Sequence, residues 1–395
     1  MRVLLVAPNA GVSLSTGGGT NLLLKQARGL ARRGHEVRLA GYHALSLPDL
    51  ERLHGVPLDG LRSRIRVVSG GGDRAFRTRG RVPGKPSPYL LLFDPRVQRW
   101  FAGLTDRWTP DLAIFHDDVP RGATAWTGRV RTSLYVHFPL RGRSARLVPP
   151  LRSSRTTAEA AQDAVLRRAR GRLILDDPVG AGIPVAANST VTAEVVERLW
   201  GLRPRVWPTY VVPEPLDPEP RGRLVVAVGA LHRGKGLERL AETFRRTAPA
   251  GAELRILGYA RDPSVLRRLR RIAQGTGGGR VVVRPDAPRS AVDAALRGAR
   301  VVATGAAFEP FGLSVLEGMA AGATALVHRS EFSGAWRDLV DGGRFGSGYS
   351  DDPDLADRLR DLLAPERAGP DPAARDRASA FDETRFDAGL AEALG

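Results

Sequence analysis

Short apolar runs of strand length alternate with amphipathic segments of helical length along most of the chain, and this alternation limits the possible folds more than any other feature. Strands that alternate with helices are typical of βαβ units, in which helices cover both faces of a parallel sheet. A proline-rich stretch, residues 208–220, interrupts the alternation, which then starts again. The sequence therefore predicts an α/β protein with two similar domains.

The first half predicts a Rossmann-like parallel sheet. A helix is expected over 20–33, because its leucine and alanine residues share one face and Gly34 follows as a typical helix end. Strands are expected at residues 2–7, 36–40, 112–115, 133–136 and 185–187.

The second half predicts a sheet of similar size, with a first domain over 1–207, a linker over 208–220 and a second domain over 221–378. Two such sheets face a central cleft, and ligands of parallel sheets bind outside the carboxyl ends of the strands. Strands are expected at 224–228, 253–257, 280–283, 301–304 and 323–327, and helices at 236–247, 263–273, 290–298, 312–321 and 355–363.

Composition excludes several classes of protein. The 395 residues include no cysteine, which rules out disulfides, cysteine-ligated zinc and a thiol nucleophile. No apolar run approaches the roughly 18 residues that a membrane-spanning helix needs, so a cytoplasmic location is expected. Arginine supplies all but three of the 60 basic residues, and this arginine-rich, cysteine-free composition suggests a bacterial origin.

The formal net charge of +18 lies almost wholly in residues 1–200, which carry +15. In its densest part, residues 62–85, arginines alternate with glycine and proline. This pattern predicts a basic loop that leaves the packed domain rather than packed structure. Three interpretations compete: a solvated face, peripheral contact with an anionic membrane at its inner face, and nucleic-acid binding. No nucleic-acid-binding motif accompanies the charge, so a nucleic-acid partner is not expected.

The first candidate loop is Gly17, Gly18 and Gly19, between the first strand and its helix. Small residues there let a ligand approach the backbone, and the helix N-terminus offers N–H groups to an anion. The alternative is a flexible turn, since neither a dinucleotide fingerprint nor a P-loop is present.

The second candidate loop, residues 228–236, follows the first strand of the second domain. Arg233 and Lys235 flank a glycine at a helix N-terminus, where two cations and the helix dipole favour a diphosphate. A solvated turn is the alternative, but Lys235 is one of only three lysines, and a generic surface position in this chain would carry arginine.

The third candidate is residues 308–322, where Glu309 ends a loop and Glu317 lies inside a small, apolar helix. A carboxylate in such a segment is costly unless it is hydrogen-bonded, and sugar or ribose hydroxyls are suitable donors. The alternative is a helix-terminal acid and a surface glutamate. His116 could pair with Asp117 or Asp118 as an acid/base group at another strand end.

The order and spacing of these motifs resemble the retaining glycosyltransferases of family 4. Segment 308–322 carries the resemblance, with seven residues between Glu309 and Glu317. Ala230 departs from it, because family members often have arginine there and Arg233 would have to substitute. Further matches lie at residues 17–19, 135–137, 187–189, 229–236 and 341–343.

The resemblance implies the GT-B fold, with a last helix over 379–395 that crosses back to the first domain. It further implies that Glu317 binds the ribose of a donor nucleotide and that Glu309 binds the hydroxyls of its sugar. Arg233 and Lys235 would hold the diphosphate.

Other roles follow from the same resemblance. The backbone N–H groups of Gly312, Leu313 and Ser314 would assist at the diphosphate. His137, which matches the family pattern better than His116 does, would contact the donor sugar from the first domain. Gly18 and Gly19 would let the donor approach that domain closely.

The resemblance thus implies a retaining hexosyltransferase that takes a UDP- or GDP-linked sugar and glycosylates a small-molecule natural product or a lipid-linked, cell-envelope acceptor. No metal or other cofactor is expected, because two cations and a helix end can stabilise the leaving diphosphate. The acidic pair Asp352 and Asp354 is expected to cap a helix instead. The alternatives are a sugar-nucleotide epimerase of the same fold and a non-catalytic basic protein that binds nucleotides or nucleic acid.

Overall fold

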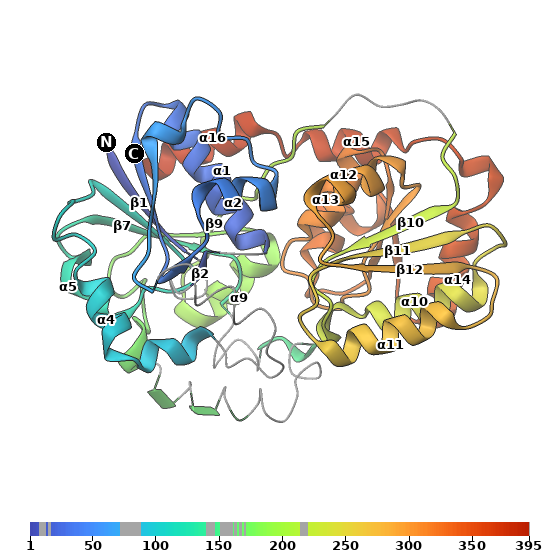
Figure 1. Cartoon of the computed structure of the whole chain (residues 1–395), viewed down its shortest axis with the longest axis horizontal. Coiled ribbons are helices and arrows are strands. Elements are labelled where there is room, and N and C mark those ends of the chain that lie inside the picture. Colours follow the sequence, from blue (N-terminus) through green and yellow to red (C-terminus); the bar gives the residue numbers. More distant parts are fainter. Residues whose placement is uncertain are drawn as a thin grey trace.

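A computed structural model describes residues 1–7, 13–14, 17–71, 88–139, 147–150, 161, 164–165, 168–169, 171–213 and 220–394. Two α/β bodies lie side by side, each with a parallel sheet, and both termini lie on the first body (Figure 1). The predicted fold class of two Rossmann-like domains is confirmed. None of the helices in the described ranges has the length and apolarity that crossing a membrane requires.

The sheet of the first domain has the strand order β5-β3-β1-β6-β7-β8-β9, with every pair parallel. β1 is the topological switch point of the sheet, because β3 and β5 lie on one side of it and β6 to β9 lie on the other. Ligands of parallel sheets bind in the crevice at such a point. The strands are β1 (Arg2–Val6), β3 (Glu36–Ala40), β5 (Ile65–Val68), β6 (Leu112–His116), β7 (Arg131–Val136), β8 (Val185–Ala187) and β9 (Arg205–Val206), and β2 (Ser13–Leu14) pairs with β4 (His43–Ala44) outside this sheet.

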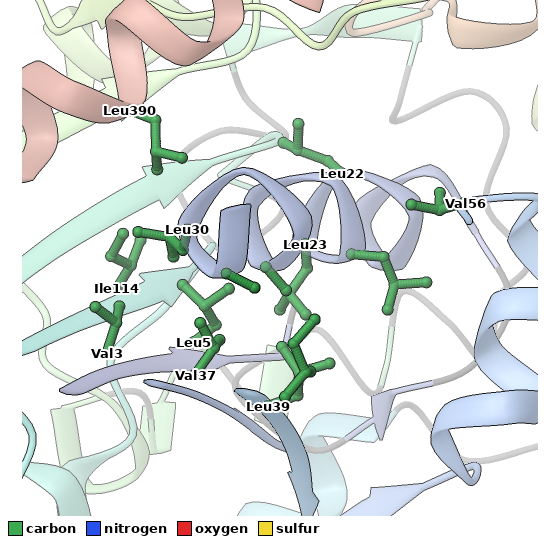
Figure 2. Close-up of a cluster of buried hydrophobic side chains, with 14 of the residues drawn as sticks. Val3, Leu5, Leu22, Leu23, Leu30, Val37, Leu39, Val56, Ile114 and Leu390 are labelled. Carbon is green, nitrogen blue, oxygen red and sulfur yellow. The ribbon is translucent and has the colours of Figure 1, made fainter. Parts of the chain in front are cut away.

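Helices cover both faces of this sheet. Figure 2 shows Leu23 and Leu30 of one helix on its side that faces Val3 and Leu5 of the central strand, within one buried cluster. Burial of such side chains stabilises the fold by about 1.5–3 kcal/mol each. The helical segments are α1 (Gly18–Arg32), α2 (Leu47–His54), η1 (Arg62–Arg64), η2 (Pro88–Phe93), α4 (Pro95–Ala102), η3 (Arg121–Ala123), α5 (Thr124–Thr127) and α9 (Thr190–Trp200).

The second domain has a parallel sheet of order β12-β11-β10-β13-β14-β15. Its strands are β10 (Leu224–Val228), β11 (Glu253–Gly258), β12 (Arg280–Pro285), β13 (Val301–Ala303), β14 (Thr324–His328) and β15 (Ser347–Tyr349). Its helical segments are η4 (Arg233–Lys235), α10 (Leu237–Thr247), α11 (Pro263–Gln274), α12 (Arg289–Gly298), α13 (Leu313–Ala320), η5 (Ala335–Leu339), η6 (Asp341–Gly343), α14 (Asp352–Leu362), η7 (Pro365–Arg367) and α15 (Pro372–Ser379). The last helix of the chain is α16 (Glu383–Leu394).

All ten predicted strands are present, and their ends lie within two residues of the prediction. The prediction that the basic segment 62–85 lacks packed structure is wrong at residues 65–68, which form the edge strand β5. Ile65 of this strand is buried while Arg66 is exposed, so the arginines project from a sheet edge. Residues 72–85 of that segment lie outside the described residues. The helix cap near Asp352 is supplied by its neighbour, Asp351, which accepts from the N–H of Asp354.

The last helix, α16, packs against α1 of the first domain. Glu383 forms ion pairs with Arg28 at 2.6 Å and Arg32 at 2.8 Å, and Leu390 is buried in the first-domain core. The preceding helix, α15, contacts α13 of the second domain. The two ends of this C-terminal segment therefore connect both domains.

Two further contacts join the domains on the cleft side. The rings of Phe138 and Phe308 meet edge to face, with centroids 4.5 Å apart. Arg337 donates to both carboxylate oxygens of Glu194 at 2.7 Å. A bidentate arginine pair of this kind fixes orientation as well as charge, so the relative placement of the domains is specified by directional contacts.

Lys25 of α1 anchors the segment that leaves the first domain. Its ammonium group donates to the carbonyl of Tyr210 and lies 3.4 Å from Thr209 Oγ1. The side chain is almost fully buried, and this burial lowers its pKa from 10.5 to about 8. The charged form is therefore held in an environment that disfavours it.

We expect Lys25 to make the free energy of unfolding rise with pH in the alkaline range. Between pH 8 and 10.5 the unfolded chain binds a proton at Lys25 that the folded chain has lost, so the free energy of unfolding increases across that window. The shift corresponds to about 3 kcal/mol. Denaturant unfolding of the wild type and of Lys25→Met at several pH values measures it, since the variant lacks the rise. Two curves that stay parallel from pH 7 to 10.5 would contradict the prediction.

Candidate functional site

Two loops at the carboxyl ends of neighbouring strands of the second sheet are in direct backbone contact. Gly236, after β10, and Gly305, after β13, approach so closely that a Cβ on Gly236 would lie 2.2 Å from the Gly305 carbonyl oxygen. Gly236 also has a φ of 59°, in the left-handed region that favours glycine. Only glycine at both positions lets the two loops close together.

This contact brings together Lys235 and Glu309, two residues that the sequence analysis assigned to one donor site. Lys235 Nζ lies 2.5 Å from Glu309 Oε2, and both side chains are largely buried. The loop of Glu309 is held in place because its carbonyl accepts from the N–H of Gly334 at 2.7 Å. The result is a fixed ion pair at the cleft end of the sheet.

The N-terminus of α13 completes this part of the site. Gly312 caps the helix with a φ of 99°, and a Cβ there would lie 2.8 Å from the Cβ of Ala335. Ser314 Oγ donates to the carbonyl of Val228 at 3.0 Å, which ties the helix start to the end of β10. The first N–H groups of a helix, here those of Gly312, Leu313 and Ser314, have no partner within the helix and attract anions.

Glu317, one turn further along α13, has a partner that the sequence analysis missed. Arg289 of α12 donates to Glu317 Oε1 at 2.8 Å and to Asp293 at 2.7 Å. Its stem also packs on Gly55 of the first domain, where an added Cβ would lie 3.0 Å from Arg289 Cγ. No spacing rule connects Arg289 with Glu317, because they lie on different helices.

The glycine loop of the first domain faces the same helix. Gly17 caps α1 with a φ of 120°, and Gly18 and Gly19 form its first turn. A Cβ on Gly18 would lie 3.9 Å from Leu313 Cδ2. The N-termini of α1 and α13 therefore meet across the cleft, with glycines where a bound molecule would need space.

His137 follows β7 and forms a pair with His116 at the end of β6. His116 Nδ1 lies 2.9 Å from His137 Nε2, and His116 Nε2 lies 2.8 Å from Gln26 Oε1. The hypothesis that His116 pairs with Asp117 or Asp118 is wrong, because both of its ring nitrogens are engaged elsewhere. Asp117 instead accepts the backbone N–H of His137 at 2.7 Å, from a left-handed φ of 67°.

Burial keeps these imidazoles neutral. It lowers the pKa of His137 to about 3, and it lowers the pKa of His116 well below the usual 6.5. The pKa of His232, which caps η4 by accepting from the N–H of Gly234, is also lowered to about 3, mainly by burial. None of the three therefore carries a positive charge near neutral pH.

Arg233 is placed differently from Lys235. Its side chain is half exposed and forms an ion pair with Asp262, at 3.9 Å. The structure thus brings Lys235, and not Arg233, into contact with Glu309. Among the described residues, no group of three or more histidine, cysteine or acidic side chains is arranged to hold a metal ion.

Residues 222–365 match the sequence model of a family described as glycosyl transferases group 1. No curated protein sequence matches the chain.

Three solved structures are similar over the full length of the chain. Sucrose-phosphate synthase from Thermosynechococcus elongatus has a TM-score of 0.71 and 14% identity, covering 99% of this chain and 97% of its own. HepE from Anabaena, in complex with UDP and glucose, has a TM-score of 0.64 and 16% identity, covering 100% and 99%. The lipopolysaccharide outer core galactosyltransferase WaaB has a TM-score of 0.58 and 14% identity, covering 100% and 99%.

Identities of this size show the fold alone. The chain has the GT-B architecture, in which two Rossmann-like domains face each other across a cleft. The family match covers the second domain, which carries Lys235, Glu309 and Glu317.

Proposed function

We propose that the chain is a retaining glycosyltransferase, which moves a sugar from a nucleoside diphosphate to a hydroxyl of an acceptor. The observation that carries the proposal is the partly buried Lys235–Glu309 pair beside the N-terminus of α13. The glycosyltransferase family match over residues 222–365 supports it independently.

The second domain offers the groups that a nucleotide sugar needs. Lys235 and the first N–H groups of α13 supply positive charge for the diphosphate, and Arg233 extends that charge toward solvent. Glu317 uses Oε1 for Arg289, which leaves Oε2 to accept from a ribose hydroxyl. Glu309 accepts from hydroxyls of the transferred sugar.

The chemistry follows from where charge develops. The bond between the anomeric carbon and the β-phosphate oxygen breaks, and the diphosphate gains negative charge that Lys235 and the helix terminus stabilise. The acceptor oxygen bonds to the anomeric carbon on the same face, and its proton leaves with the departing phosphate. Closure of the domains over the donor would exclude water and limit hydrolysis.

We propose a UDP- or GDP-linked donor, because the similar HepE structure contains UDP and glucose. The acceptor is a small natural product or a lipid-linked, cell-envelope molecule, and the enzyme acts in the cytoplasm or at the inner face of the membrane. WaaB, a lipopolysaccharide galactosyltransferase, has the same fold.

A panel of nucleotide sugars tests the proposal directly. Each donor is incubated with the protein. Binding is measured as the shift in melting temperature, and cleavage is measured as released nucleoside diphosphate by mass spectrometry. We expect at least one UDP- or GDP-sugar to stabilise the protein and to release its nucleotide slowly even in water. A protein that neither binds nor cleaves any member would refute the proposal, and conversion of the donor to its epimer would favour the epimerase alternative.

Lys235→Ala and Glu309→Gln should each lower kcat/KM for the active donor by at least about 100-fold, because each removes a group that acts on developing charge or on the sugar. Circular dichroism should show that both variants stay folded. Arg255→Ala is the matched control, since it removes an ion pair with Glu253 in the same domain, at the amino-terminal end of β11 and so away from the loops at the carboxyl ends of the strands. Full activity in either site variant would overturn the assignment.

Transfer should also persist in the presence of a chelator, because protein cations and a helix end offset the charge of the diphosphate. Initial rates with and without excess EDTA should agree within about twofold. Loss of activity that magnesium or manganese restores would show that a metal ion takes part.

A further inference from the structure

We propose that Gln26 and His116 hold the ring of His137 in the tautomer with its proton on Nε2, so that Nδ1 offers a lone pair to the donor sugar. The site then selects a sugar that presents a hydroxyl at this point over one that presents a carboxylate. The second statement rests on the proposed function, whereas the first concerns the protein alone.

The geometry forms a chain of three side chains from three elements. Gln26 lies on α1, His116 ends β6 and His137 follows β7. Gln26 and His116 are fully buried, while His137 is only partly buried. The two contacts, 2.8 Å and 2.9 Å, are of normal hydrogen-bond length.

The proton positions follow from the chemistry of the partners. Gln26 Oε1 can only accept, so His116 Nε2 must carry a hydrogen. A neutral imidazole has one N–H, which leaves His116 Nδ1 as an acceptor for the N–H of His137 Nε2. His137 in turn keeps a bare Nδ1, and within the described residues no hydrogen bond to this atom is recorded.

The charges around the two rings are consistent with these proton positions. Two adjacent imidazolium rings would repel each other, and burial lowers the pKa of both histidines. The nearby carboxylate, Asp117, accepts the backbone N–H groups of His137 and Phe138. The pair is therefore neutral, and its tautomer is set from the Gln26 end.

Gln26 shows a second sign of this role. Its Nε2 is buried, and among the described residues it has no hydrogen-bond partner. A buried donor left unsatisfied destabilises a protein, and leucine would fill similar space without that penalty. Of the two polar amide atoms, the oxygen is the one that has a partner among the described residues, and that partner is His116.

This tautomer makes the site selective for the chemical group of the sugar that contacts His137 Nδ1. A hydroxyl can donate to the lone pair on Nδ1, whereas an ionised carboxylate presents only acceptors and meets repulsion there. A neutral hexose is therefore favoured over the corresponding uronate.

The tautomer is tested by ¹⁵N NMR of protein labelled at its seven histidines. We expect both His116 and His137 to show a protonated Nε2 and a bare Nδ1 near neutral pH. Gln26→Leu should shift both rings toward a mixture of tautomers, whereas Gln98→Leu, which removes another amide of the first domain, should leave them unchanged. A protonated Nδ1 on wild-type His137 would overturn the proposal, and so would a Gln26→Leu spectrum identical to that of the wild type.

Selectivity is tested with the active hexose donor and the uronate of the same sugar and nucleotide. The wild type should prefer the hexose by at least about tenfold in kcat/KM, and Gln26→Leu should lower this ratio. Equal use of both donors by the wild type would overturn the sugar assignment. A protein that cleaves no donor would instead refute the proposed function, and the NMR result would still decide whether Gln26 sets the tautomer.

Discussion

The backbone contact between Gly236 and Gly305 is the constraint on which the candidate site depends. Two strands of a parallel sheet end at the same edge, but their loops would normally be held apart by side chains. Here neither position has a Cβ, so the loop that carries Lys235 lies directly on the loop that leads to Glu309. The ion pair then forms at 2.5 Å without any long-range rearrangement of the chain. Because the backbone sets this geometry, the charges stay in place before a donor arrives.

A second set of contacts links this site to the placement of the domains. Glu317 is held by Arg289, whose stem packs on Gly55 of the first domain. Lys25, buried beside the start of the linker, lies close enough to Glu317 for the carboxylate to raise the lysine pKa against the effect of burial. The group proposed to hold ribose is thus coupled to both domains. Nucleotide binding at Glu317 would therefore act on the same contacts that set the domain arrangement.

The sequence predicted what depends on local pattern and missed what depends on tertiary contact. Strands buried on both faces, such as β10, are apolar along their full length and were located within two residues. The two-residue strand β9 carries too little pattern to be recognised. Arg289 lies 28 residues from Glu317, so only the fold brings them together. Lysine rarity drew attention to Lys235, which the structure places in contact with Glu309. The same rarity could have singled out Lys25, but this residue lies among the leucines of an expected helix and carried no motif.

The distribution of charge changes how the basic first domain is understood. Within the described ranges, this domain places glycines of α1 and a histidine that burial keeps neutral at the cleft loops, and its buried cation Lys25 lies near Glu317. The site's charged groups, Lys235, Glu309 and Glu317, all belong to the second domain. The diphosphate would therefore be recognised by charge on one side, and the sugar by neutral hydrogen bonds on the other. Substitutions in the Gln26, His116 and His137 chain should for this reason alter which sugar is used while leaving nucleotide affinity nearly unchanged.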